Sequence, residues 1–251
     1  VEESSAGAEI HVPKPGPIAL SDVRWTSANI GEEEKEKKRS LTDGHPTVAC
    51  VLHARRSRLQ QVLATSQTWL PTCDFHALIS FGEIAEQLKS FPQARFTHPS
   101  GGLEKCFDRI ALNLSTTLFP HADWHFLASD DSFVMVDRLR EWLRQQKASG
   151  ASYLDISSDG RPALLISDEA IGSLNITECD QTAIVAVGSL LKRSDLSSLP
   201  SVDSMNRPII LRGETRSKMA VNLSLSPHLS IVQRVSPSEM TLMHHIHTPQ
   251  T

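Results

Sequence analysis

Two adjacent acidic residues are the feature of this sequence best suited to chemistry. Ser129-Asp130-Asp131-Ser132 follows the apolar run 124–128, which predicts a buried strand that ends in a polar turn. Ligands of open α/β sheets bind beyond the carboxyl ends of strands, and carboxylate oxygens there can hold hard divalent cations. Such a cation bridges nucleotide phosphates and stabilises a leaving diphosphate. In the alternative interpretation, Asp130 or Asp131 caps the following helix and complements its dipole.

Other residues with catalytic or metal-binding side chains form weaker patterns. His244, His245 and His247 cluster near the C-terminus, where they either bind a metal or are ordinary surface histidines. His98 and Ser100 are interpreted as loop residues, because a catalytic triad depends on geometry rather than on proximity in sequence. The sequence contains no glycine-rich phosphate loop and no Gly-x-Ser-x-Gly nucleophile elbow.

The cysteines lack the Cys-x-x-Cys spacing that is typical of zinc ribbons and thioredoxin-type motifs. There are four of them, at Cys50, Cys73, Cys106 and Cys179. An even number permits two disulfides, and the spacing alone leaves the three alternative pairings open.

Three Asn-x-Ser/Thr sequons add to the case for an extracytoplasmic protein. They begin at Asn113, Asn175 and Asn222. Asn113 lies inside a helical pattern, so Asn175 and Asn222 are the predicted glycosylation sites. Together with the even number of cysteines, the sequons favour a luminal or secreted protein.

Composition argues against two classes of partner. Lys and Arg number 25 and Asp and Glu number 29, so the formal charge is −4 and the chain is a poor candidate for nucleic-acid binding. No stretch approaches the roughly 20 apolar residues of a membrane-spanning helix. The chain begins with Val1, so a membrane anchor, if there is one, is expected to precede the given sequence.

The 251 residues divide into a predicted tail and one predicted domain. Residues 1–45 are interpreted as a flexible stem, because 1–17 is rich in Gly, Pro and small polar residues and 31–39 is a run of mixed charge. Residues 46–251 form the predicted domain, in which the Ser-rich stretch 192–218 is an irregular loop.

Apolar runs alternate with helical periodicity along this domain. Continuous apolar runs predict strands at 47–52, 75–81, 124–128, 153–156 and 163–166. Apolar residues at helical spacing predict helices at 59–70, 103–118 and 136–143, and Ser167-Asp168-Glu169 predicts a capped helix start. The alternation predicts an α/β fold with a mostly parallel sheet and covering helices.

Four segments, taken in order, resemble a known enzyme family. They are Cys50 with Thr68-Trp69 and Cys73, then 123–143, 163–170 and 236–243. Across residues 46–247 they resemble the β1,3-glycosyltransferases of family 31, and most closely the core 1 β1,3-galactosyltransferase (T-synthase) branch with its dedicated chaperone Cosmc. Ser236-Pro237 followed by Met240 and Met243 is most similar to the chaperone. The resemblance implies a GT-A-like, Rossmann-type sandwich.

The chain departs from the enzymes of this family at three catalytic elements. The enzymes' three consecutive aspartates are reduced to Ser129, Asp130 and Asp131, and a glycine-rich acceptor segment appears as Asp159-Gly160-Arg161-Pro162. The Glu-Asp pair that supplies the catalytic base is represented by Glu178 and Asp180, with a cysteine between them. These departures favour a fold that is kept for binding rather than for transfer.

The resemblance therefore implies a non-catalytic, Cosmc-like chaperone without a cofactor. Its client would be core 1 β1,3-galactosyltransferase, which makes mucin-type O-glycans. Its place would be the lumen of the endoplasmic reticulum or Golgi, as a type II membrane protein in full-length form. Met240 and Met243 are the candidate partner-binding residues, although helical methionines also serve as core.

In the alternative, the chain is an active or divergent β1,3-galactosyltransferase that moves galactose from UDP-galactose to GalNAc-Ser/Thr. Mn²⁺ would then bind Asp131 with Asp130 nearby, and Glu178 or Asp180 would act as the base. The resemblance also implies a Cys50–Cys73 disulfide and, less directly, a second bridge between the remaining cysteines, Cys106 and Cys179. The oligomeric state, including a homo-oligomer, is left open.

Overall fold

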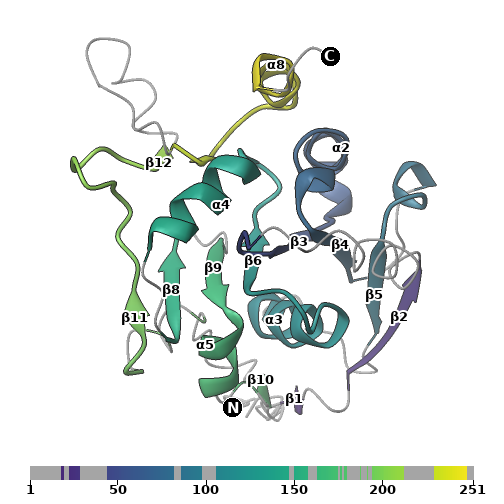
Figure 1. The fold of residues 1–251 in the computed structure, drawn as a ribbon. Helices are drawn as coiled ribbons and strands as arrows, with labels where there is room; N and C mark the ends of the chain where they lie inside the picture. Colours follow the sequence, from purple (N-terminus) through teal and green to yellow (C-terminus); the bar gives the residue numbers. More distant parts are fainter. Residues whose placement is uncertain are drawn as a thin grey trace, which may run out of the picture.

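A single sheet forms the centre of the fold. The structure is a computed structural model that describes residues 18–19, 23–28, 44–81, 86–97, 106–146, 150–157, 163–174, 176, 178–179, 187, 191, 194–211 and 229–247. The strands of the main sheet are β2 (Arg24–Ala28), β3 (Val48–His53), β4 (Phe75–Ser80), β5 (Gln93–Thr97), β6 (Trp124–Ala128), β8 (Ser152–Asp155), β9 (Leu164–Ser167) and β11 (Ser197–Ser198). Their order across the sheet is β11-β8-β9-β6-β3-β4-β5-β2 (Figure 1).

Most of these strands run in one direction. β3 pairs in parallel with both β4 and β6, and β4 pairs in parallel with β5. β9 runs against its neighbours β6 and β8, and β2 runs against β5 at the edge of the sheet. Helices lie between successive parallel strands, so the predicted α/β sandwich with a mostly parallel sheet is confirmed.

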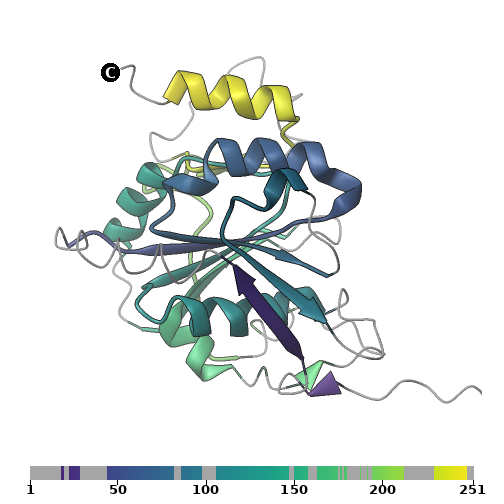
Figure 2. The same ribbon diagram turned by 90° about the vertical axis from the view of Figure 1, so that its right-hand side faces the viewer.

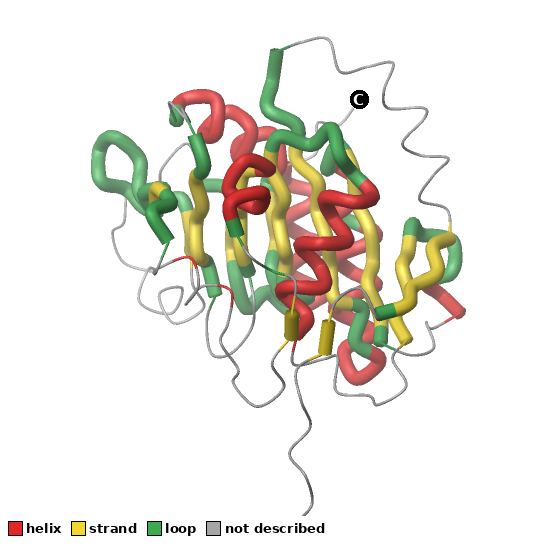
Figure 3. Tube along the Cα trace, turned by 90° about the horizontal axis from the view of Figure 1, so that it is seen from below, coloured by secondary structure: helices red, strands yellow, loops and turns green. Residues whose placement is uncertain are grey.

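Helices cover both faces of the sheet. α2 (Leu59–Gln67) and α4 (Val136–Gln145) lie on one face, and α8 (Pro237–His247) packs outside α2. α3 (Phe107–Leu118) and α5 (Asp168–Ser173) cover the other face (Figures 2 and 3).

The sequence of β3 explains why helices are needed on both faces. Alternate residues of a strand point to opposite faces, and here both sets are apolar. Cys50 and Leu52 belong to the core under α2 and α4, whereas Ala49 and Val51 belong to the core under α3. On α5, Ser167 caps the helix as predicted, because its side chain accepts a hydrogen bond from the Ala170 N–H at 3.3 Å.

Short elements complete the described fold. A small sheet contains β7 (Phe133–Val134), β12 (Ile210–Leu211) and β13 (Ile231–Val232), and β1 (Ile18–Ala19) pairs with β10 (Glu178–Cys179). The 3₁₀ turns are η2 (Arg56–Arg58), η3 (Leu70–Thr72) and η4 (Glu86–Leu88). No helix among the described residues is long and apolar enough to cross a membrane.

Two segments that were predicted to be irregular contribute strands. Arg24–Ala28 lies in the predicted stem, yet it forms the edge strand β2 and pairs with β5. The segment has no apolar alternation, because an edge strand is held by backbone hydrogen bonds with little burial. Within the predicted loop 192–218, Ser197–Ser198 and Ile210–Leu211 form two-residue strands, and most of the other described residues there are irregular, as predicted.

The predicted Cys50–Cys73 disulfide is confirmed. It joins β3 to the end of η3, with a Cα–Cα distance of 6.1 Å and a sequence separation of 23. Cys106 is also disulfide-bonded, which agrees with the predicted second bridge, and the side chain of Cys179 lies outside the described part of the chain.

Replacing both cysteines of the first bridge, as Cys50→Ala with Cys73→Ala, is expected to lower the free energy of unfolding by about 3 kcal/mol. The bridge closes a loop of 23 residues and so restricts the unfolded chain. Urea denaturation of the oxidised proteins measures the difference. An unchanged midpoint and slope would show that the bridge contributes nothing to stability.

Candidate functional site

The acid turn, residues 129–132, lies where the strand order of the sheet reverses. β4 and β5 extend from one side of β3, whereas β6 lies on the other side. The turn follows β6, and Arg55 and Arg58 follow the carboxyl end of β3 next to it. In open α/β sheets, the ligand crevice lies at such a reversal, outside the carboxyl ends of the strands. The structure therefore places Asp130 and Asp131 at the position where a ligand is expected.

Asp130 is fully buried and is held by two arginines. Arg55 donates from Nε to Oδ2 at 3.1 Å and from Nη2 to Oδ1 at 2.9 Å. Arg58 donates from Nη1 to Oδ1 at 3.1 Å. The positive charge of the guanidinium groups compensates the buried carboxylate, which would be very unfavourable if it were unpaired.

Asp131 and the serines form the rest of the turn. Ser129 Oγ donates to Asp131 Oδ1 at 2.8 Å and lies 2.7 Å from Ser132 Oγ. Arg58 Nη1 lies 3.6 Å from Asp131 Oδ2, so the same arginine reaches both aspartates. The indole N–H of Trp69 donates to the Ser132 carbonyl at 2.7 Å. These contacts fix the conformation of the turn.

This donor set does not fit Mn²⁺ as predicted for the alternative function. A hard cation needs several oxygen ligands, but Ser129 already donates to Oδ1 of Asp131, the predicted ligand, and Arg58 lies 3.6 Å from its Oδ2. Both oxygens of Asp130 already accept hydrogen bonds from guanidinium groups. A cation there would also meet the positive charges of Arg55 and Arg58. Among the described residues, no group of three or more His, Cys, Asp or Glu side chains has metal-binding geometry.

The interpretation of the acid pair as a helix cap is wrong. α4 begins at Val136, and its N-cap residue is Met135, which makes no side-chain capping bond. The short strand β7 stands between the acid turn and this helix. Both aspartates therefore lie too early in the chain to cap α4, and their contacts are with the arginines and Ser129 instead.

The predicted catalytic base is not brought to the acid turn in the described structure. Glu178 belongs to β10, which pairs with β1 apart from the main sheet. Figure 1 shows β10 at the opposite end of the molecule from α8, whereas the Val235 N–H just before α8 donates to the Asp131 carbonyl. The side chain of Glu178 lies outside the described residues. So do the other predicted site or loop residues Asp180, Asn175, Asn222, His98 and Ser100, and the segment 159–162.

Met240 is a core residue and not part of an exposed patch. It is fully buried, and Thr65 Oγ1 donates to its sulfur at 3.5 Å. Met243 is partly buried against the same core. The large apolar side chains of α8 that are exposed are Leu242 and Ile246.

A Ser–His–Asp chain, in which Ser115 and His125 are buried and Asp168 is about half exposed, lies at the other end of β6 and was missed by sequence reasoning. Ser115 Oγ lies 2.7 Å from His125 Nδ1, and His125 Nε2 lies 3.2 Å from Asp168 Oδ1. Burial lowers the pKa of His125, although Asp168 partly opposes this effect. Ser115 is fully buried, so it cannot reach a substrate as a nucleophile. We interpret the chain as structural.

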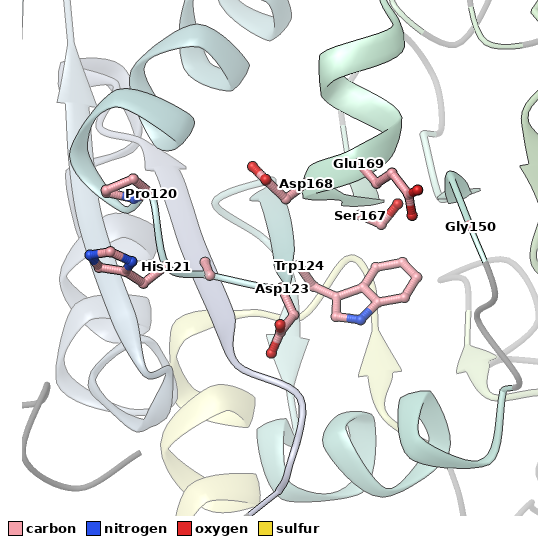
Figure 4. A pocket seen from close by; sticks show the side chains of 9 residues that line it. Pro120, His121, Asp123, Trp124, Gly150, Ser167, Asp168 and Glu169 are labelled. Carbon is pink, nitrogen blue, oxygen red and sulfur yellow. The ribbon is translucent and has the colours of Figure 1, made fainter. Parts of the chain in front are cut away.

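Asp168 also lines a pocket of about 430 Å³ (Figure 4). Asp123 and Trp124, at the start of β6, form another part of its wall. The Asp123 carboxylate accepts hydrogen bonds from the Thr47 N–H at 2.7 Å and from Thr47 Oγ1 at 2.8 Å. This pocket lies at the end of β6 opposite to the acid turn, away from the expected ligand crevice.

His53, the last residue of β3, packs against α3. Its ring stacks on Phe107 with ring centroids 4.4 Å apart. Burial first, and the charge of Arg55 second, lower its pKa from 6.5 to about 4. The folded protein therefore holds this side chain neutral in mildly acidic solution.

Acid is expected to destabilise the protein through His53. The unfolded chain takes up a proton near pH 6.5 and the folded protein only near pH 4, so this contribution is complete above pH 6.5 and is lost as the pH falls. The loss should reach about 3 kcal/mol at pH 4. His53→Phe should remove it, as measured by urea denaturation between pH 7 and 4. The exposed His121→Gln is the control, and equal slopes in all three proteins would contradict the prediction.

Comparisons with known proteins find only distant structural similarity. No protein-family model matches the sequence, and no curated protein does. Solved structures similar to this chain include a glycosyltransferase involved in the glycosylation of the major capsid of PBCV-1, with a TM-score of 0.46, 9% identity and coverage of 80% of this chain and 100% of that one. Another is the apo form of glycosyltransferase GlyE from Streptococcus pneumoniae TIGR4, with a TM-score of 0.46, 12% identity and coverage of 76% of this chain and 55% of that one.

At this level of similarity, neither protein indicates the donor, acceptor or activity of this chain. The resemblance to family 31 and its core 1 branch stays a prediction from the sequence.

Proposed function

We propose that this chain is a non-catalytic, Cosmc-like chaperone that assists folding of core 1 β1,3-galactosyltransferase. The observation that carries the proposal is the state of the acid turn. In a metal-dependent transferase this turn would present carboxylates to a cation. Here Asp130 is buried and takes its hydrogen bonds from Arg55 and Arg58.

The energetics of the turn support a role other than metal-assisted transfer. Mn²⁺ bound to Asp131, with Asp130 nearby, would lie beside Arg58, whose Nη1 is 3.6 Å from Asp131 Oδ2, and Asp130 could join it only by breaking contacts with both arginines. Burial of Asp130 makes that exchange costly, because a buried carboxylate depends strongly on its partners. The acid turn is therefore poorly suited to metal-assisted stabilisation of a leaving diphosphate, which supports a role in binding a protein client.

Calorimetric titration with Mn²⁺, in the presence and absence of UDP-galactose, tests the absence of a metal-dependent donor site. We expect Mn²⁺ to cause no saturable binding and no strengthening of UDP-galactose binding. Asp131→Ala is the control, because it removes the carboxylate that the alternative function needs. Mn²⁺-dependent binding that disappears in Asp131→Ala would overturn the proposal in favour of the galactosyltransferase.

Refolding of denatured core 1 β1,3-galactosyltransferase tests the chaperone role directly. Recovered transferase activity should rise with the concentration of this protein and not with an equal mass of serum albumin. Leu242→Ser with Ile246→Ser tests whether α8 contacts the client, and Met205→Ser is matched as an exposed apolar residue elsewhere. Recovery no better than with albumin would refute the chaperone role.

The proposed location is the lumen of the endoplasmic reticulum or Golgi. The Cys50–Cys73 disulfide supports an oxidising compartment. In this proposal Asn175 and Asn222 carry N-glycans. Expression in a secretory host, followed by enzymatic removal of N-glycans, should lower the apparent mass, and Asn175→Gln with Asn222→Gln should abolish that change.

A further inference from the structure

Arg55 and Arg58 have hydrogen-bonding capacity beyond what Asp130 uses. Arg55 bonds Asp130 through Nε and Nη2, and Arg58 bonds the aspartates through Nη1. In the described part of the chain, Arg55 Nη1 and Arg58 Nε and Nη2 make no other hydrogen bond. The two side chains are 35% and 27% exposed, so solvent and solutes reach them. Guanidinium donors that Asp130 does not use therefore lie on partly exposed side chains at the carboxyl ends of β3 and β6.

The carboxylate of Asp130 holds the two guanidinium groups in place before any ligand binds. Both guanidinium groups reach the same oxygen, Oδ1, so they lie side by side. Asp130 itself is fully buried behind them and accepts from both oxygens. An anion that arrives from solvent meets the arginines and not this carboxylate. Little side-chain freedom is then lost on binding, which favours affinity.

The local backbone adds positive potential. α2 begins at Leu59, and its N-cap residue, Arg58, makes no side-chain capping bond. The first N–H groups of a helix carry partial positive charge and attract anions. Their position after β3, at the reversal of strand order, is where α/β sheets bind ligands.

We propose that Arg55 and Arg58 form a binding site for a phosphoryl anion, such as one end of a diphosphate, that needs no divalent cation. Arginine is suited to this task because its planar fork of donors matches phosphate oxygens in pairs. The guanidinium groups supply the positive charge that a metal would otherwise bring to this edge of the sheet. This inference does not depend on the chaperone proposal.

Calorimetric titration with inorganic pyrophosphate, in EDTA and at low salt, tests this site in the full chain. We expect saturable binding at one site. Arg58→Gln should weaken it at least tenfold, because glutamine removes the charge but can still donate to Asp130. Arg144→Gln is the matched control, since Arg144 is a surface arginine of α4 paired with Glu141, and it should leave the affinity unchanged.

Two further measurements complete the test. Titration with uridine diphosphate in place of pyrophosphate shows whether the site takes a nucleotide. If it does, uridine diphosphate binds more tightly than pyrophosphate. Arginine Nε–H signals of the wild-type protein, followed by NMR, should shift on addition of pyrophosphate even if Arg58→Gln fails to fold. Absence of saturable binding, or equal weakening in Arg58→Gln and Arg144→Gln, would overturn the site. Neither outcome affects the Mn²⁺ and refolding tests.

Discussion

Loss of both arginines, as Arg55→Met with Arg58→Met, is expected to lower the free energy of unfolding by about 3–5 kcal/mol. The variant leaves the Asp130 carboxylate fully buried without the donors that it has in the native protein. An uncompensated buried charge is among the most unfavourable changes that a substitution can cause. Urea denaturation at pH 7 measures the effect.

The matched variant adds Asp130→Asn to the two arginine replacements. It removes the buried charge while it keeps the volume of the side chain, so most of the lost stability should return. If the triple variant is as unstable as the double variant, packing of the arginine side chains, rather than charge compensation, accounts for the loss. The comparison thus separates electrostatics from the apolar contacts of the arginine stems.

Trp69→Ala should have an effect of similar size, about 3–5 kcal/mol. The indole is almost fully buried, and its ring centroid lies 6.2 Å from that of Phe126 in β6. Its N–H donates to the Ser132 carbonyl at 2.7 Å, so it also supports the acid turn. The alanine variant combines a large cavity with the loss of this hydrogen bond.

Trp69→Phe separates the two contributions. Phenylalanine fills most of the space but cannot donate to the Ser132 carbonyl, and we expect a loss of about 1–3 kcal/mol for the unsatisfied acceptor. Urea denaturation of both variants gives the two values. A phenylalanine variant as stable as the native protein would show that the hydrogen bond has no net value.

The parts of the fold that sequence reasoning anticipated are those with strong local signals. β3, β4 and β6 are buried on both faces, so each appears as a continuous apolar run. α3 shows its buried face through Ile110, Ala111 and Leu114. The edge strand β2 carries no such signal, because backbone pairing with β5 holds it and the side chains of Arg24, Trp25 and Thr26 are exposed.

The contacts of the candidate site depend on strand order, which the sequence does not display. The acid turn was visible as a pair of adjacent aspartates after a strand. Its arginine partners lie 72 and 75 residues earlier, and they meet Asp130 only because β6 lies next to β3. The available signal was the basic run after the first predicted strand, which becomes informative once β3 and β6 are known to be neighbours.

β3 lies at the centre of the sheet and is synthesised before both of the strands that flank it, β4 and β6. During synthesis the disulfide-closed segment, with β3, α2 and both arginines, emerges well before β6. At a synthesis rate of roughly 5–20 residues per second, β6, the second strand that pairs with β3, is made several seconds after β3. Until then it is an unprotected apolar edge, open to pairing with other nascent chains. This protein, proposed to assist the folding of another, therefore passes through a stage in which it needs protection itself.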